Sequence, residues 1–229
     1  MKKTLIIDPF SGASGDMFLG ALVDLGAPFE AFRETLRGIP ELAAVSIERE
    51  SVTRGVFAAT RIKVTCPEEK AHRSLSTIRD LIERADIGDG VKKRAIETFT
   101  RLATAEAKVH GSDIESVHFH EVGALDAIAD IVGTHVALDL LGNPQCLVRT
   151  ITVGSGTTRS AHGKMPLPAP ATLELLAGLP VRFSERGEEL VTPTGAALIA
   201  STATPLSTGS LVVPEKVGYG AGSREGEGL

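Results

Sequence analysis

The chain has 229 residues, of which 42% are hydrophobic and 23% charged, and its formal net charge is −5. These values are typical of a globular protein with a sizeable core, and the negative charge argues against a nucleic-acid-binding surface, which needs clustered Lys and Arg. No apolar run approaches the roughly 20 residues of a membrane span.

The first apolar run breaks at Asp8-Pro9 and is too short for a signal peptide, so it predicts a strand at 4–8. Cys66 and Cys146 lie in no CxxC pattern, which favours a cytoplasmic protein without a disulfide. Hydrophobic periodicity over residues 1–143 predicts a hairpin at 45–65 and helices at 16–25, 29–36, 74–85, 91–110 and 121–141.

The last third of the chain is richer in Gly and Pro. It predicts a strand in LVRTITVGSG, a proline-punctuated loop that leads into a helix in SAHGKMPLPAPATLELLAG, and a loop-to-helix step in TPTGAALIA. We expect an α/β or α+β fold with two sublobes, 1–143 and 144–222. Residues 223–229 are interpreted as a flexible tail or as the boundary to a further domain.

The stretch IIDPFSGASGDMFLG places glycines between a strand and a helix. Gly12, Ser14 and Gly15 would let backbone amides face an anion, although the spacing matches no standard phosphate loop. Asp8 stands at the carboxyl end of the strand and Asp16 at the helix start, where each is either a functional acid or, for Asp16, a helix cap. The loop is therefore a candidate wall of a phosphate or metal site.

The stretch VHFHEVGALDAIADIVG is a more specific candidate for a metal site. His118 and His120 alternate in an extended segment, Glu121 follows, and Asp126 and Asp130 share a helix face four residues apart. Imidazoles and carboxylates so close together suit a borderline divalent ion such as nickel, zinc or cobalt. The alternative is a pair of surface histidines and an ordinary acidic first turn, but acids inside an apolar stretch favour a metal.

A third stretch, VGSGTTRSAHGKMPLPAPAT, carries Arg159, His162 and Lys164 among small residues. These groups predict a site for phosphate or carboxylate, with a solvated basic loop as the alternative. In TPTG, we expect Thr192 or Thr194 to cap the helix that follows.

The motifs DPFSGASGDMFLGALVDLG, VHFHEVGALDAIADIVG, VGSGTTRSAHGKMPLPAPATLELL and TPTGAAL, in this order, resemble the LarC family of nickel-pincer cofactor biosynthesis proteins. The resemblance spans nearly the whole chain. It implies a CTP-dependent cyclometallation, a lyase-type reaction that inserts Ni²⁺ into pyridinium-3,5-bisthiocarboxylic acid mononucleotide and makes the cofactor of lactate racemase. CTP would be used with Mg²⁺ or Mn²⁺, and the lactate racemase apoprotein would receive the product.

Within that resemblance, the His and carboxylate residues would deliver the metal, and the glycine loop with Arg159 and Lys164 would hold the nucleotide phosphate. His162 or His120 would remove the ring proton as the Ni–C bond forms. Family members continue past the GYGAG segment into a C-terminal domain associated with CTP, so this chain resembles the N-terminal part and would need that domain as a partner.

Two alternatives remain open at this point. One is a non-catalytic nickel-binding module or metallochaperone that needs a separate CTP-binding domain. The other is an unrelated metal-dependent hydrolase acting on a phosphorylated substrate. A homo-oligomer is compatible with each of these interpretations.

Overall fold

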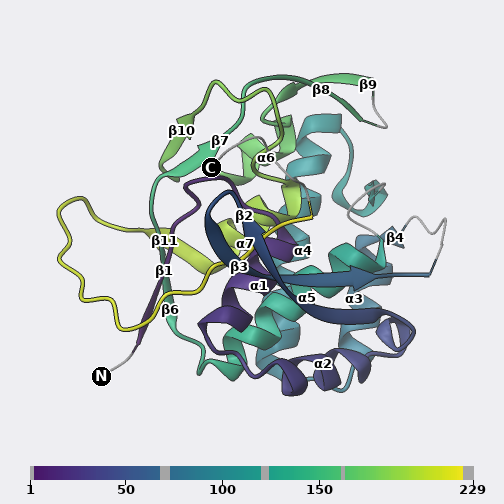
Figure 1. Cartoon of the computed structure of the whole chain (residues 1–229). Coiled ribbons are helices and arrows are strands. Elements are labelled where there is room, and N and C mark those ends of the chain that lie inside the picture. Colours follow the sequence, from purple (N-terminus) through teal and green to yellow (C-terminus); the bar gives the residue numbers. More distant parts are fainter. Residues whose placement is uncertain (1–2, 68–72, 120–123, 161–162, 224–229) are drawn as a thin grey trace.

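The computed structural model describes residues 3–67, 73–119, 124–160 and 163–223. Helices and short strands alternate along the chain, which confirms the expected mixed α/β class (Figure 1). The helices are α1 (Gly15–Leu25), α2 (Phe29–Arg37), α3 (Leu75–Arg84), α4 (Asp89–His110), α5 (Leu125–Leu140), α6 (Pro170–Leu175) and α7 (Pro193–Thr202), with single 3₁₀ turns at Pro40–Leu42 and Ile114–Ser116.

The helices follow the predicted periodicity closely, apart from one boundary. Helix α1 ends at Gly26, as the sequence indicates, and the Gly26 N–H donates to the Leu22 carbonyl at 3.2 Å. Helix α5 begins at Leu125, later than the predicted start at residue 121, because Ala124 is extended. Residues 120–123 of that prediction lie outside the described part of the chain.

The strands form several small sheets instead of one large sheet. They are β1 (Thr4–Ile7), β2 (Ser46–Arg54), β3 (Phe57–Thr65), β4 (Arg73–Ser74), β5 (His118–Phe119), β6 (Gln145–Val148), β7 (Ile151–Val153), β8 (Gly156–Ser160), β9 (Gly163–Leu167), β10 (Val181–Phe183) and β11 (Ala203–Pro205). A parallel sheet has the order β1-β6-β11, with Leu5 opposite Cys146. This sheet joins the first residues of the chain to segments beyond residue 143.

The β2–β3 hairpin is the predicted one, and it lies across α1 (Figure 1). The last third differs from the sequence prediction. The stretch expected as one strand contains parts of β6 and β8 and the whole of β7, and the proline-punctuated loop contains β9, which pairs with β8. These strands are three to five residues long, too short to show alternation, and β7 and β11 pair in parallel with distant segments.

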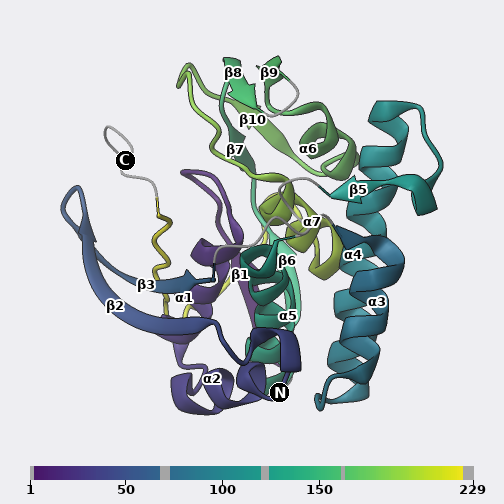
Figure 2. The ribbon, with the colours of Figure 1, turned by 90° about the vertical axis from the view of Figure 1, so that its right-hand side faces the viewer.

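Helices α4 and α5 each pack against several other helices. Helix α4 packs against α3, α5, α6 and α7, and Figure 2 shows α3 and α4 on the flank opposite the β2–β3 hairpin. Helix α5 packs against α1, α2, α4 and α7, so nearly all of its faces are buried. This burial on all sides explains why its sequence is apolar almost throughout.

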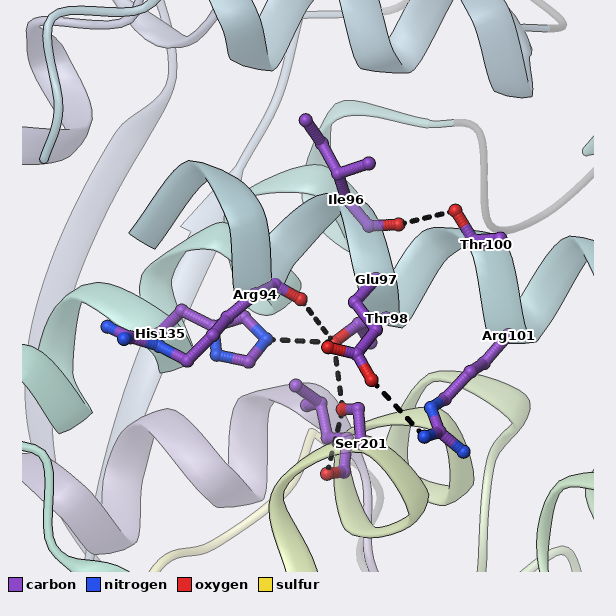
Figure 3. Close-up of polar contacts among 9 residues, drawn as sticks. Arg94, Ile96, Glu97, Thr98, Thr100, Arg101, His135 and Ser201 are labelled. Atoms are coloured by element: carbon purple, nitrogen blue, oxygen red, sulfur yellow. Dashed lines mark hydrogen bonds and ion pairs between the residues drawn. The ribbon is translucent and has the colours of Figure 1, made fainter. Parts of the chain in front are cut away.

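A buried polar network links α4, α5 and α7 (Figure 3). The Thr98 hydroxyl donates to the Arg94 carbonyl at 3.0 Å, and it lies 2.8 Å from both His135 Nε2 and Ser201 Oγ. The single proton of the Thr98 hydroxyl is shared between the Arg94 carbonyl and Ser201 Oγ, whose own hydroxyl donates to the Leu198 carbonyl at 3.2 Å, so His135 Nε2 can act as a donor to Thr98. Nδ1 of His135 has no hydrogen-bond partner in the described part of the protein. Burial, with a smaller contribution from the Arg94 charge, lowers the pKa of His135 to about 3.

This histidine predicts a specific loss of stability in acid. The unfolded chain binds a proton at His135 below its ordinary pKa of 6.5, whereas the folded chain does so only near pH 3. The stability contribution is therefore complete above pH 6.5 and falls as the pH drops towards 3. Relative to His135→Gln, the wild type should lose about 2 kcal/mol of unfolding free energy between about pH 8 and about pH 5.

Urea unfolding at the two pH values measures this loss, and His110→Gln, at the exposed end of α4, is the matched control. An equal free-energy difference between wild type and His135→Gln at both pH values would contradict the prediction.

Candidate functional site

The opening loop, residues 8–14, runs from the end of β1 to the start of α1 and pairs with a distant segment. The Ala13 N–H donates to the Leu190 carbonyl at 2.9 Å, and the Thr192 N–H donates to the Ala13 carbonyl at 3.0 Å. At Gly12 the backbone has φ +98°, and a Cβ there would overlap the Leu190 carbonyl oxygen. Only glycine fits this position, so the loop has a fixed path.

The TPTG motif forms the other side of this contact. Thr192 caps α7, as predicted, because its hydroxyl accepts from the Gly195 N–H at 3.1 Å. A Cβ at Gly195 would overlap the Ala13 carbonyl oxygen. Two motifs that are far apart in the sequence therefore interlock through their backbones.

Asp16 lies in the first turn of α1, and both of its carboxylate oxygens accept hydrogen bonds. Oδ1 accepts from the Ser14 hydroxyl and from the Met17 N–H at 2.9 Å, whereas Oδ2 accepts from the Ser223 N–H at 2.7 Å. Ser14 occupies the N-cap position, but its side chain binds Asp16 and does not cap α1, and Asp16 itself binds the Met17 N–H of the first turn. The orientation of the Asp16 carboxylate is thus set from both ends.

Asp126 and Asp130 lie one turn apart at the start of α5, next to α1. Asp126 is exposed and accepts from the Ala127 N–H at 2.8 Å, whereas Asp130 is partly buried. A Cβ at Gly15 would overlap the Asp130 carboxylate, so the first residue of α1 lies directly on this side chain. The structure therefore brings two predicted acidic segments together.

The proximity of these acids has an electrostatic consequence. Burial raises the pKa of Asp130 well above its usual value, and the charges of Asp16 and then Asp126 raise it further. No Lys or Arg of the described residues forms an ion pair with any of the three acids. A carboxyl group in these surroundings would be stabilised by a bound cation.

Asp8 has a different environment. Its Oδ2 lies 2.5 Å from Arg149 Nη1 in an exposed ion pair at the end of β1. In the same region Arg186 donates from Nη1 to the Ser11 hydroxyl at 3.1 Å. No local pattern in the sequence indicates Arg149, Arg186 and Ser223 as neighbours of the loop, because each contact joins residues more than 140 positions apart.

The histidines of the predicted site are only partly described. His118 lies in β5, opposite Ser74, but its side chain is outside the described part of the protein. His120, Glu121 and His162 also lie outside the described residues. Among the groups that are described, no three His, Cys, Asp or Glu side chains converge as metal ligands would. Asp16 and Asp126 are near enough to Asp130 for their charges to affect it, but the three acids do not by themselves form a set of metal ligands.

The predicted basic group lies on the β8–β9 hairpin. Arg159 is opposite Lys164 in the strand register, and the Lys164 side chain is exposed. The side chain of Arg159 is not among those described. Within the described ranges, no helix combines the length and the apolar character that a membrane span needs.

Comparison with known proteins gives a consistent result. Residues 5–229 match the family model described as nickel insertion protein. The pyridinium-3,5-bisthiocarboxylic acid mononucleotide nickel insertion proteins of two Desulfitobacterium hafniense strains, DCB-2 and Y51, are each 44% identical over 97% of this chain and 55% of their own length. A relative from Geotalea uraniireducens is 45% identical over 97% of this chain and 57% of its own length. No solved structure matches.

The surroundings of Asp130 predict that this residue lowers stability. Its raised pKa means that the folded chain holds the proton more tightly than the unfolded chain, so stability decreases as the pH rises through the folded pKa. Asp130→Asn should raise the free energy of unfolding at neutral pH by on the order of 1 kcal/mol. The gain should vanish in acid, where both states are protonated.

Urea unfolding across the pH range measures this gain in unfolding free energy. The control is Asp80→Asn, a substitution at an exposed residue of α3. An Asp130→Asn protein that is less stable than the wild type at neutral pH would show that the carboxyl makes a net favourable contact.

Proposed function

This chain belongs to the nickel insertion protein family, and on that premise we propose that it handles Ni²⁺ during nickel insertion into pyridinium-3,5-bisthiocarboxylic acid mononucleotide. The observation that carries the proposal is the approach of Asp16, Asp126 and Asp130 where α1 and α5 begin. Because the chain spans 55–57% of the length of the relatives named above, the complete reaction is part of the proposal.

The acids are suited to a cation, and nickel is here the substrate to be inserted. Carboxylate oxygens supply negative charge, and imidazole nitrogens give the borderline character that Ni²⁺ prefers. His118, His120 and Glu121 directly precede α5 in sequence, so they are the residues we expect to complete the ligand set.

The geometry of the opening loop supports a cation more than a phosphate. The Gly12 N–H donates to the Pro9 carbonyl at 3.3 Å, and the Ala13 N–H is bonded to Leu190, so these amides already have acceptors. Ser14 and Gly15 contact Asp16 and Asp130, whose charges would repel a phosphate. We therefore assign the substrate phosphate to Arg159 and Lys164 of the hairpin.

In the reaction, Ni²⁺ would form bonds to the two thiocarboxylate sulfurs and to a ring carbon, and that carbon would lose its proton. A neutral imidazole is a suitable general base near neutral pH, and His162 and His120 are the proposed general bases. CTP with Mg²⁺ or Mn²⁺ would bind a separate protein portion that corresponds to the part of the relatives outside the match. The lactate racemase apoprotein would accept the product.

A second candidate function is a nickel-binding module without catalytic activity of its own. The observation that favours it is the coverage, because more than two fifths of each named relative lies outside the match. In this case the chain would bind Ni²⁺ and require a separate CTP-binding portion for insertion.

Nickel binding tests the metal site directly. We expect Asp16→Asn, Asp130→Asn and the double variant His118→Ala/His120→Ala each to weaken Ni²⁺ binding at least about tenfold, since each removes a proposed ligand. Isothermal titration calorimetry measures the affinity, and Asp80→Asn is the control. Titration curves identical to that of the wild type for all three variants would contradict the proposed nickel site.

Reconstitution separates the two candidate functions. The chain is incubated with Ni²⁺, CTP, Mg²⁺ and the pyridinium mononucleotide, with and without the remaining portion of the Desulfitobacterium relative, and lactate racemase activation is measured. Activation only with both pieces supports a split insertase, and retained nickel binding without activation supports the binding module. Failure of both nickel binding and activation by the folded chain would overturn the proposal.

A further inference from the structure

The glycine-rich segment near the C-terminus, residues 217–223 and here called the strap, is an ordered part of the fold. The Thr60 N–H of β3 donates to the Tyr219 carbonyl at 2.9 Å, and the Ala221 N–H donates to the Thr60 carbonyl at 2.9 Å. Gly220 thereby forms a parallel bridge with Thr60. Figure 2 shows this segment running beside α1 and behind the hairpin.

Close backbone contacts set the position of the strap along α1. A Cβ at Gly220 would overlap the Met17 carbonyl oxygen, and one at Gly218 would overlap the Ala21 carbonyl oxygen. Because the two glycines contact successive turns of the helix, sliding the strap by one residue would push Tyr219 or Ala221 into the helix backbone. The register between the strap and α1 is therefore unique.

Asp24, near the end of α1, links the strap to β3. Its Oδ1 accepts from the Thr60 hydroxyl at 2.8 Å, and its Oδ2 accepts from the Tyr219 N–H at 2.9 Å. Further along the strap, Arg54 of β2 donates from Nη2 to the Gly222 carbonyl at 3.0 Å. These contacts hold the strap on both sides of Gly220.

With this fixed register, the end of the strap lies next to Asp16 of the candidate metal site. Two helical turns before Asp24, the same helix bears Asp16, whose Oδ2 accepts the Ser223 N–H at 2.7 Å. The other oxygen, Oδ1, is held locally by the Ser14 hydroxyl, just before α1, and by the Met17 N–H. Among the described residues, the Ser223 amide is thus the contact from a distant segment that orients this carboxylate.

We propose that Asp24 is a positioning residue for nickel binding, and that it acts through the strap by keeping the Ser223 amide on Asp16. The proposal rests on the proposed function, because it takes Asp16 as a nickel ligand. Residues that hold metal ligands by hydrogen bonds in this way commonly change metal affinity when they are substituted.

The test compares Ni²⁺ binding of the wild type with Asp24→Asn, which keeps the side-chain shape but cannot accept both hydrogen bonds. We expect roughly 10- to 100-fold weaker binding by calorimetry and a shifted d–d absorption band of the bound Ni²⁺. Thr60→Val, which removes one donor to Asp24 and leaves every acid in place, should give a smaller change in the same direction. Asp80→Asn is the control.

A double-mutant cycle distinguishes positioning from a general loss of stability. If Asp24 acts through Asp16, then adding Asp24→Asn to Asp16→Asn should cause no further loss of nickel affinity. An additive loss, or wild-type affinity and spectrum for both Asp24→Asn and Thr60→Val, would overturn the role of Asp24. Asp16→Asn binding as tightly as the wild type would instead overturn the proposed metal site, and the role of Asp24 with it.

Discussion

The opening loop can lie where it does because glycines stand at the points where other segments touch it. Gly12 meets the Leu190 carbonyl, Gly15 meets the Asp130 carboxylate, and Gly195 meets the loop from the side of α7. Side chains at these points would force apart the segments that the loop joins. The meeting of α1, α5 and α7 around the loop, and hence the approach of Asp16 to Asp130, depends on this close backbone contact.

The acids that meet there lower the stability of the folded chain. Asp130 is a partly buried carboxyl with two acidic neighbours, and burial alone already opposes its ionisation. Structural acids are usually paired with Lys or Arg, as Asp8 is with Arg149 and Asp139 with Arg94 in this protein. The lack of such pairing for Asp16, Asp126 and Asp130 within the described residues supports the proposal of a cation site there.

Membership of the nickel insertion protein family supports Ni²⁺ as the proposed cation and removes the basis for the alternative of an unrelated hydrolase. It also limits what this chain is expected to do by itself, because the match covers a little over half of each named relative. The proposed nickel site, in which Asp16 accepts a hydrogen bond from Ser223 of the strap, would suit a chain that holds nickel while another portion supplies the nucleotide-dependent step.

Local patterns in the sequence were enough to predict the long elements. Helical spacing and Gly26 delimit α1, alternation around Thr53-Arg54-Gly55 gives the β2–β3 hairpin, and Thr192 caps α7. The candidate acids were also recognisable, because aspartates within apolar helices are uncommon. These features depend on neighbours within a few residues, which a single sequence displays.

Tertiary structure decided which of these pieces touch. The three-residue strands β7, β10 and β11 gain their hydrogen bonds from distant partners, so no periodic pattern marks them. The sequence likewise left the GYGAG segment as part of an irregular end, whereas Asp24, Thr60 and Met17 hold it against α1. The pairing of Asp16 with Ser223 joins residues 207 positions apart. Such contacts arise from the packing of whole elements, and local sequence alone does not encode them.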